Sequence, residues 1–148
     1  MRTDKLTTAF QQALSDAQSL AVGFDSPTME PLHVLSALLQ QDQGSTKSLL
    51  ARAGVNTQRL GQAVDSALEG LPKVAKPEGQ VTVGSELVRL FNLTDREAQK
   101  RGDQFIASEL FLLALADDKG PAGKLLRESG LTRKNLELAV DADRKSVV

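Results

Sequence analysis

Few side chains in this sequence could carry out acid–base chemistry. His33 is the only histidine, and it stands in the apolar run Pro-Leu-His-Val-Leu. A general base must lie within hydrogen-bond reach of the proton that it removes, and a Ser–His–acid triad also needs a placed nucleophile. The sequence has no Gly-x-Ser-x-Gly motif to supply one. We therefore interpret His33 as a partly buried structural residue at the start of a helix, hydrogen-bonded to a neighbouring loop.

The composition argues against several other functions. The chain has 148 residues, no cysteine, and 18 Lys and Arg against 19 Asp and Glu. Without cysteine there is no disulfide or thiolate metal site, and one histidine cannot form a multi-histidine zinc site. Balanced charge and the lack of Trp and Tyr argue against a nucleic-acid partner. No phosphate-binding glycine motif is present, so we expect no metal, no cofactor and no enzymatic activity in these residues.

Two acidic residues, Asp103 and Glu109, stand close together in the sequence. Asp103 follows Gly102, and Glu109 falls in the first turn of a predicted helix. Each has an ordinary structural explanation. Aspartate favours turns, and glutamate at a helix N-terminus compensates the helix dipole by about 0.3–1 kcal/mol.

Two leucines give these carboxylates a second interpretation. On the helix predicted over residues 85–101, Leu93 lies about 200° round from the core residue Phe91, so it faces away from its own half. Leu110 begins a helix that is apolar nearly all round, so this helix is central or exposes an apolar edge. Two interpretations stay open. The leucines line an apolar groove rimmed by the two carboxylates, or they seal the interface between two halves of the chain.

The sequence contains an internal repeat, which indicates the fold that positions these residues. Residues 49–64 (LLARAGVNTQRLGQAV) and 125–140 (LLRESGLTRKNLELAV) share one pattern without a gap, 76 residues apart. In each copy a glycine, Gly54 or Gly130, ends a helix where left-handed backbone is favoured, and we interpret both as structural. One half of the chain therefore approximates the other, although the first two helices of each half align with an offset nearer 78.

Periodicity and capping residues predict an all-α fold of eight short helices, arranged as two tandem four-helix repeats with pseudo-two-fold symmetry. One four-helix unit is too small to bury enough surface alone, so the halves should pack together. We expect a single domain over residues 1–148: repeat one at about 1–70, a linker at 71–84 with a short strand at 81–83, repeat two at 85–143, and the start of a tether at 144–148. Helix caps are predicted at Thr3 or Asp4, Asn56, Ser85, Ser108 and Thr132.

The sequence also predicts where the protein is found. Residues 1–5 turn amphipathic at once and lack the apolar stretch of a signal peptide. The longest apolar run, residues 110–116, is far too short to span a bilayer. We expect a soluble cytoplasmic protein with no membrane partner. The lack of a heptad pattern favours a monomeric isolated domain.

Four motifs are similar to those of a known family. The stretch Ala-Gln-Ser-Leu-Ala at residues 17–21, followed by Glu-Pro-Leu-His-Val-Leu-Ser-Ala-Leu-Leu at 30–39, resembles the N-terminal domain of Clp ATPases. The stretches Ala-Gln-Lys-Arg-Gly-Asp at 98–103 and Ser-Glu-Leu-Phe at 108–111 resemble it too, and a tandem repeat is that family's hallmark. The opening Met-Arg-x-Asp-x-Leu-Thr and the Glu-Pro-Leu-His form are most similar to the protein-disaggregase branch. The resemblance covers essentially all 148 residues.

This resemblance implies a mobile recruitment module of a larger AAA+ chaperone, a homohexamer whose other modules bind ATP and Mg²⁺. Such a module captures apolar stretches of unfolded or aggregated polypeptides and passes them to the ring. The resemblance implies a polar patch of Thr7, Asp103 and Glu109, beside a hydrophobic groove that includes Leu93 and Leu110. It implies no cofactor for the module itself.

Two alternatives remain. The N-terminal domains of ClpA and ClpC dock a dedicated folded adaptor protein, but those relatives differ at the N-terminus and at Glu30-Pro31. A small enzyme that uses His33 is the alternative from another class. Replacing His33 by glutamine separates that alternative from a structural role, because a structural histidine affects stability alone.

Overall fold

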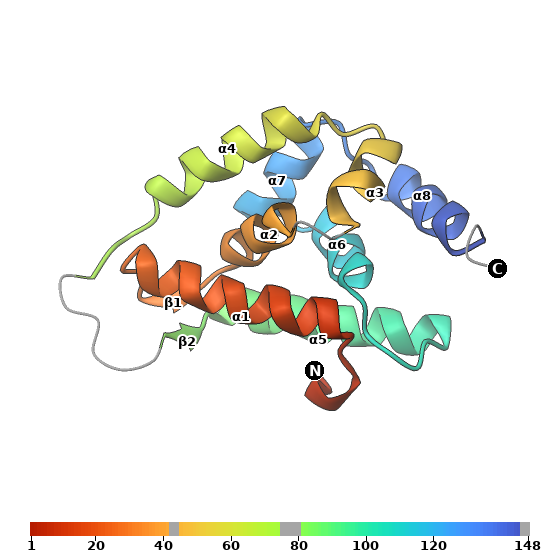
Figure 1. Cartoon of the computed structure of the whole chain (residues 1–148), viewed down its shortest axis with the longest axis horizontal. Helices are drawn as coiled ribbons and strands as arrows, with labels where there is room; N and C mark the ends of the chain where they lie inside the picture. Colours follow the sequence, from red (N-terminus) through yellow and green to blue (C-terminus); the bar gives the residue numbers. More distant parts are fainter. Residues whose placement is uncertain (42–44, 75–80, 146–148) are drawn as a thin grey trace.

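The computed structural model describes residues 1–41, 45–74 and 81–145 of the chain. Helices dominate these residues and strands are limited to two short pieces, which confirms the predicted all-α fold (Figure 1). The elements in chain order are the 3-10 helix η1 (Thr3–Lys5), α1 (Thr8–Gly23), β1 (Thr28–Met29), α2 (Pro31–Gln40), α3 (Thr46–Arg52), α4 (Thr57–Glu69), β2 (Thr82–Val83), α5 (Ser85–Arg101), α6 (Ser108–Ala116), α7 (Pro121–Glu128) and α8 (Arg133–Lys145).

The first long helix begins later than its predicted caps. Thr3 and Asp4 form the 3-10 turn instead. Thr7 is the N-cap of α1, where its hydroxyl oxygen accepts a hydrogen bond from the backbone N–H of Phe10 at 3.2 Å. A threonine oxygen here satisfies one of the free N–H groups of the first helical turn. Thr7 therefore has a structural role in addition to any contact that it makes with a partner.

Two other predicted caps are displaced by one residue. Ser85 and Ser108 are the first helical residues of α5 and α6, and the extended residues before them, Gly84 and Ala107, hold the N-cap positions. Asn56 caps α4 as predicted, by accepting a backbone N–H bond at 3.1 Å. Assigned helix boundaries commonly differ by a residue or two, so these shifts leave the predicted element order intact.

The two repeats are joined by a pair of matching parallel bridges. β1 pairs with β2, with Met29 opposite Val83, and a single bridge joins Leu6 to Ile106. A shift of 77 residues carries Leu6 onto Val83 and Met29 onto Ile106, so each bridge repeats the other. The offset in this region is therefore 77, and the predicted value of 78 is wrong by one residue. In each bridge, the chain leading into one repeat pairs with the connection between the first two helices of the other.

Reciprocal helix packing completes the symmetry. α1 packs on α2, as α5 packs on α6. The last helix of each repeat contacts the third helix of the other, α4 against α7 and α8 against α3. In Figure 1, α2, α6 and α7 lie in the middle of the molecule, with α4 on one side of them, α3 and α8 on another, and α1 and α5 running beneath.

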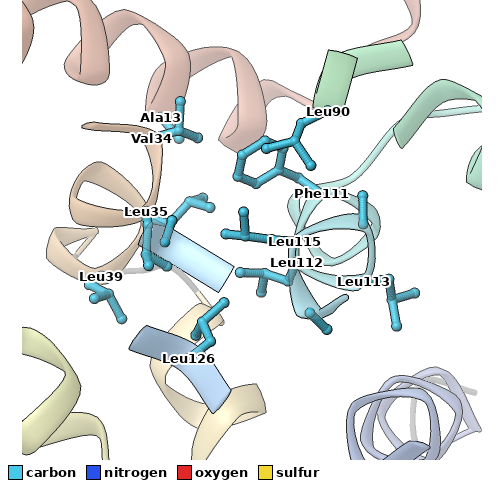
Figure 2. Close-up of a cluster of buried hydrophobic side chains, with 14 of the residues drawn as sticks. Ala13, Val34, Leu35, Leu39, Leu90, Phe111, Leu112, Leu113, Leu115 and Leu126 are labelled. Atoms are coloured by element: carbon cyan, nitrogen blue, oxygen red, sulfur yellow. The ribbon is translucent and has the colours of Figure 1, made fainter. Parts of the chain in front are cut away.

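α6 is the centre of the core. Residues 110–116 are all buried, and the labelled side chains of α6 point in several directions around its axis (Figure 2). The Phe111 ring contacts Phe10 of α1 and Phe91 of α5, with centroids 5.9 and 6.1 Å apart. A helix that is apolar all round needs cover on every side. This requirement decides the open question for Leu110, which is 0% exposed and seals the core.

The two repeated glycines lie close together, in the turn after α3 and the turn after α7. Gly54 and Gly130 have φ of 94° and 112°, in the left-handed region that glycine adopts most easily. A Cβ on Gly130 would lie 2.8 Å from the carbonyl oxygen of Gly54. The neighbouring Asn56 N–H donates to the Ser129 carbonyl at 3.1 Å. Gly130 is therefore needed both for its backbone angle and for the close approach of the two turns.

The segments predicted as linker and tether are partly described. β2 lies within the short strand predicted at 81–83, while residues 75–80 fall outside the described part. α8 continues through Arg144 and Lys145, so the helix extends two residues into the predicted tether; residues 146–148 are not described. Across the described residues, no helix is both long enough and apolar enough to cross a membrane.

Candidate functional site

Arg144 organises the two carboxylates singled out in the sequence. Its Nη1 and Nη2 donate to Oδ1 and Oδ2 of Asp103 at 3.1 and 2.8 Å. Its Nε and Nη2 also donate to Oε1 of Glu109 at 3.0 and 2.8 Å. The hydrogen bonds that Arg144 donates to Asp103, and then to Glu109, raise the pKa of Arg144, although partial burial acts in the opposite direction. We call Asp103, Glu109 and Arg144 the ionic cluster.

Thr7 is hydrogen-bonded to the segment of chain that connects the two carboxylates of the ionic cluster. The Thr7 N–H donates to the carbonyl of Ile106 at 3.1 Å, and the Ile106 N–H donates to the carbonyl of Lys5 at 2.7 Å. Ile106 stands between Asp103 and Glu109 in the α5–α6 loop. The structure therefore brings the three residues of the predicted polar patch to one corner of the molecule. Arg144 joins them there, a residue that no sequence motif marked.

The two predicted groove leucines do not join this corner as surface residues. Leu93 is 36% exposed and lines shallow depressions with Ala114, Asp117 and Arg133. All of these neighbours belong to repeat two, so Leu93 borders other elements of its own half and does not face away from it as predicted. Leu110 is buried and cannot line a surface groove in this structure. The reason is the central position of α6, in which every residue from Leu110 to Ala116 is buried.

An apolar groove does exist elsewhere, between α1 and α5. It has a volume of about 450 Å³ and is open to solvent. Val83 and Val88, 41% and 45% exposed, contribute to it. Its other lining residues are Met1, Thr3, Leu14, Ser15, Gln18, Met29, Phe91 and Asn92. We call this feature the α1–α5 groove.

Little in the sequence predicts this groove. Phe91 is expected in the core stripe of its helix, but it is only half-buried and lies at the groove floor. Met1 and Val83 come from segments distant in the chain, and the terminal amine of Met1 contacts the Asn92 side chain at 3.4 Å. Only the packing of η1 and β2 beside the two helices puts these residues together. The one available signal was Val88, an apolar residue outside the predicted core stripe of its helix.

A smaller cavity of about 140 Å³ lies between the start of α2 and the α6–α7 loop. Four prolines line it, Pro27, Pro31, Pro72 and Pro121. Its volume suits one apolar side chain, whereas the α1–α5 groove has room for several residues of an extended chain. The groove is therefore the stronger candidate for binding a polypeptide.

His33 is fully buried and its two ring nitrogens are both occupied. Nδ1 accepts the backbone N–H of Glu30 at 2.8 Å, as part of a capping box at the start of α2. Nε2 lies 3.1 Å from the hydroxyl of Ser26. Because Nδ1 accepts, the neutral ring carries its proton on Nε2 and donates it to Ser26. Burial lowers the pKa of His33, which favours the neutral ring. This ring does not accept a proton from Ser26, because the nitrogen that faces the serine already carries one.

The described residues offer no group of three or more side chains suited to hold a metal ion. They do include an organised polar site, the ionic cluster, and an open apolar site, the α1–α5 groove. The groove lining combines apolar side chains with a few hydroxyl and amide groups. The fold defines a two-repeat, all-α helical domain.

The comparisons with known proteins identify the family. Residues 5–129 match the Clp repeat (R) N-terminal domain, and the chain belongs to this family. It is 50% identical over 141 residues to the chaperone protein ClpB of Pseudomonas putida, and 46% identical over 144 residues to that of Vibrio cholerae. These alignments cover 95% and 97% of this chain, but it spans only 16% and 17% of those relatives.

Solved structures share the fold at lower identity. The Hsp104 N-terminal domain from Candida albicans has a TM-score of 0.84 at 20% identity, covering 95% of this chain and 91% of that one. The N-domain of ClpV from Vibrio cholerae has a TM-score of 0.78 at 23% identity, covering 93% and 83%. A ClpV N-domain in complex with a VipB peptide has a TM-score of 0.71 at 22% identity, covering 90% and 82%. These likenesses support the all-α fold described above.

Proposed function

We propose that this chain is the substrate-recruiting domain of a ClpB-type protein disaggregase. In this role it binds apolar stretches of unfolded or aggregated polypeptides and hands them to an AAA+ ring. The observation that carries the proposal is the α1–α5 groove, which presents Val83 and Val88 to solvent in a member of this family. The disaggregase activity belongs to a larger cytoplasmic homohexamer, in which ATP and Mg²⁺ bind to the ring and not to this domain.

The geometry of the groove suits clients without a fixed sequence. Its walls are apolar, and a few polar side chains, among them Gln18 and Asn92, can hydrogen-bond to a passing backbone. A shallow surface of this kind binds many segments weakly, which helps release toward the ring. Six tethered copies would raise the overall avidity without a higher affinity at each site.

The residues predicted from the sequence have different places in this proposal. Thr7, Asp103 and Glu109 flank the N-terminal segment that forms one end of the groove. Leu93 offers a separate exposed apolar contact on α5. Leu110 supports the site from the core and makes no contact with a client in this conformation.

The test is a titration of the ¹⁵N-labelled chain with reduced, alkylated α-lactalbumin, a permanently unfolded polypeptide. We expect amide shifts to gather on residues that line the α1–α5 groove, and Val88→Ser to weaken binding. Leu138→Ser is the matched control, because Leu138 is also an exposed apolar residue on a helix but lies on α8. Shifts that avoid the groove, or equal losses in both variants, would overturn its assignment.

The alternative remains an adaptor-docking domain of the ClpA or ClpC kind. A solved ClpV N-domain complex with a VipB peptide is an example of a partner peptide bound to this fold. A purified folded adaptor that binds this chain at a one-to-one ratio, while the unfolded polypeptide does not, would reverse the ranking of the two functions.

A further inference from the structure

Arg144 of the ionic cluster occupies a position that is apolar in the other repeat. In α4 the buried residues Leu60, Val64 and Leu68 follow one another at helical spacing. The repeat offset of 76 carries Leu60 and Val64 onto Leu136 and Val140, which are buried in α8. It carries Leu68 onto Arg144. A core leucine in repeat one is therefore an arginine in repeat two, and its carboxylate partners are found only there.

Arg144 is tied to its partners more firmly than an ordinary surface cation. It makes four hydrogen bonds to two carboxylates, and the bond pair to Asp103 is bidentate. The side chains of Asp103 and Glu109 are only 19% and 18% exposed. Bidentate bonds between guanidinium and carboxylate fix geometry as well as charge. The carboxylates are thus already engaged within the chain, one on each side of the α5–α6 loop.

That loop in turn holds the N-terminal segment. Ile106 bonds to Lys5 and Thr7 through its backbone, and Leu6 is the bridge partner between them. The same segment continues back through Thr3 to Met1, both of which line the α1–α5 groove. A contiguous set of contacts therefore runs from the end of α8, through the loop, to one end of the groove.

We propose that Arg144 is a positioning residue for the α1–α5 groove. Through Asp103 and Glu109 it fixes the α5–α6 loop, and the loop fixes the N-terminal segment that forms one end of the groove. Asp103 and Glu109 thus serve binding by holding Arg144, and they do not contact the client directly. The part of this inference that concerns client binding rests on the proposed function.

The first measurement needs no client. Amide exchange of Thr7 and Ile106 reports their two bridge hydrogen bonds, and Gly84, whose N–H donates to Met29 at 2.9 Å in the matching bridge, is an internal control. We expect Arg144→Gln to speed exchange at Thr7 and Ile106 by about tenfold and to leave Gly84 unchanged. Arg52→Gln is the matched control variant, because Arg52 also joins α8, through an exposed pair with Asp143 at 3.5 Å. Unchanged exchange at Thr7 and Ile106 in Arg144→Gln would overturn the proposed positioning.

The second measurement is the affinity for reduced, alkylated α-lactalbumin. We expect Arg144→Gln and the double variant Asp103→Asn/Glu109→Gln each to weaken binding about three- to tenfold, as typical coupled sites do. The triple variant should lose no more than either, because the three residues act as one unit. Arg144→Lys should restore binding in part, since lysine keeps the charge but not the bidentate geometry.

The outcomes separate this inference from the proposed function. If the carboxylate variant loses affinity while Arg144→Gln keeps it, the carboxylates contact the client and the inference is wrong. Additive losses in the triple variant lead to the same conclusion. If the natural chain does not bind the probe at all, the proposed function fails, and amide exchange alone decides whether Arg144 holds the N-terminal segment.

Discussion

The two repeats share a backbone but place their polar groups differently. In repeat one, Ser26 and His33 form a buried pair beside the first turn of α2. A shift of 77 residues carries them onto Asp103 and Leu110, and the polar partners in repeat two become Asp103, Glu109 and Arg144 at the surface. The polar partners in repeat one are therefore neutral and lie inside the protein, whereas those in repeat two are charged and are reached by solvent.

This difference shows where a duplicated fold can acquire a function. A buried neutral pair contributes rigidity, because an unpaired polar group there would be costly. A partly exposed ionic cluster contributes less stability but remains accessible to salt. The residues that follow the symmetry thus supply a stable frame. The departures from the symmetry mark repeat two as the half whose polar groups are accessible to solvent.

The largest expected effect on stability comes from a comparison of Leu68, near the end of α4, with Arg144, at the matching position of α8. Leu68→Ala should lower the free energy of unfolding by about 2–5 kcal/mol, because it leaves a cavity in a packed core. Arg144→Ala should cost only about 1 kcal/mol, because its charges are partly solvated. Urea denaturation of both variants measures the difference. Equal losses would mean that the ionic cluster is as important to stability as the core.

The two turn glycines provide the next comparison. Gly54→Ala should cost about 1 kcal/mol, the usual penalty for a side chain in left-handed backbone, since nothing lies within 4 Å of its new Cβ. Gly130→Ala should cost about 2–3 kcal/mol, because a steric clash with the Gly54 carbonyl adds to the same penalty. Thermal unfolding of both variants tests this order, and a smaller loss for Gly130→Ala would show that the turns can separate.

The buried His33 predicts a pH dependence of the stability that originates in repeat one. Burial lowers the pKa of His33 below 6.5, so the unfolded chain takes up the proton first as the pH falls. The stability contributed by the neutral ring is complete above about pH 6.5 and is lost progressively below it. His33→Gln should flatten this slope between about pH 7 and 5.5. Chemical denaturation across that range is the measurement, and a slope unchanged by the substitution would assign the dependence to other groups.

The smallest effect is expected on the outer face of α5. Leu93 corresponds to Asp16 of repeat one, also exposed, so Leu93→Asp makes the second repeat resemble the first. We expect a change in stability within about 0.5 kcal/mol, as for most surface substitutions. The affinity for unfolded polypeptide should fall less than with Val88→Ser. A larger fall would place the main client contact at Leu93 and outside the α1–α5 groove.

The sequence predicted the frame of this protein better than its surfaces. Local signals sufficed for the frame: the repeated pattern predicted both turn glycines, and Asn56 was recognised as a cap because capping acts within one helical turn. Burial of Leu110 followed from an apolar pattern all round its helix, one of the two interpretations left open. These features depend on neighbours close in sequence.

The surfaces depend on residues far apart in the chain. Met1 and Val83 meet only because the two bridges bring their segments beside α1 and α5. Arg144 was assigned to a tether, although comparison with Leu68 at the end of the matching helix would have marked it as a departure from the repeat. Which carboxylates such an arginine reaches is decided by the packing of α8, and no local pattern contains that information.

The reciprocal bridges have a consequence for synthesis of the chain. Leu6 is synthesised before the rest of repeat one, but its partner Ile106 is made only after the whole of repeat one and α5. The β1–β2 bridge can form earlier, but only once β2 has been made after repeat one. The nascent first half must therefore remain soluble without its final partners, and contacts of such long range slow folding.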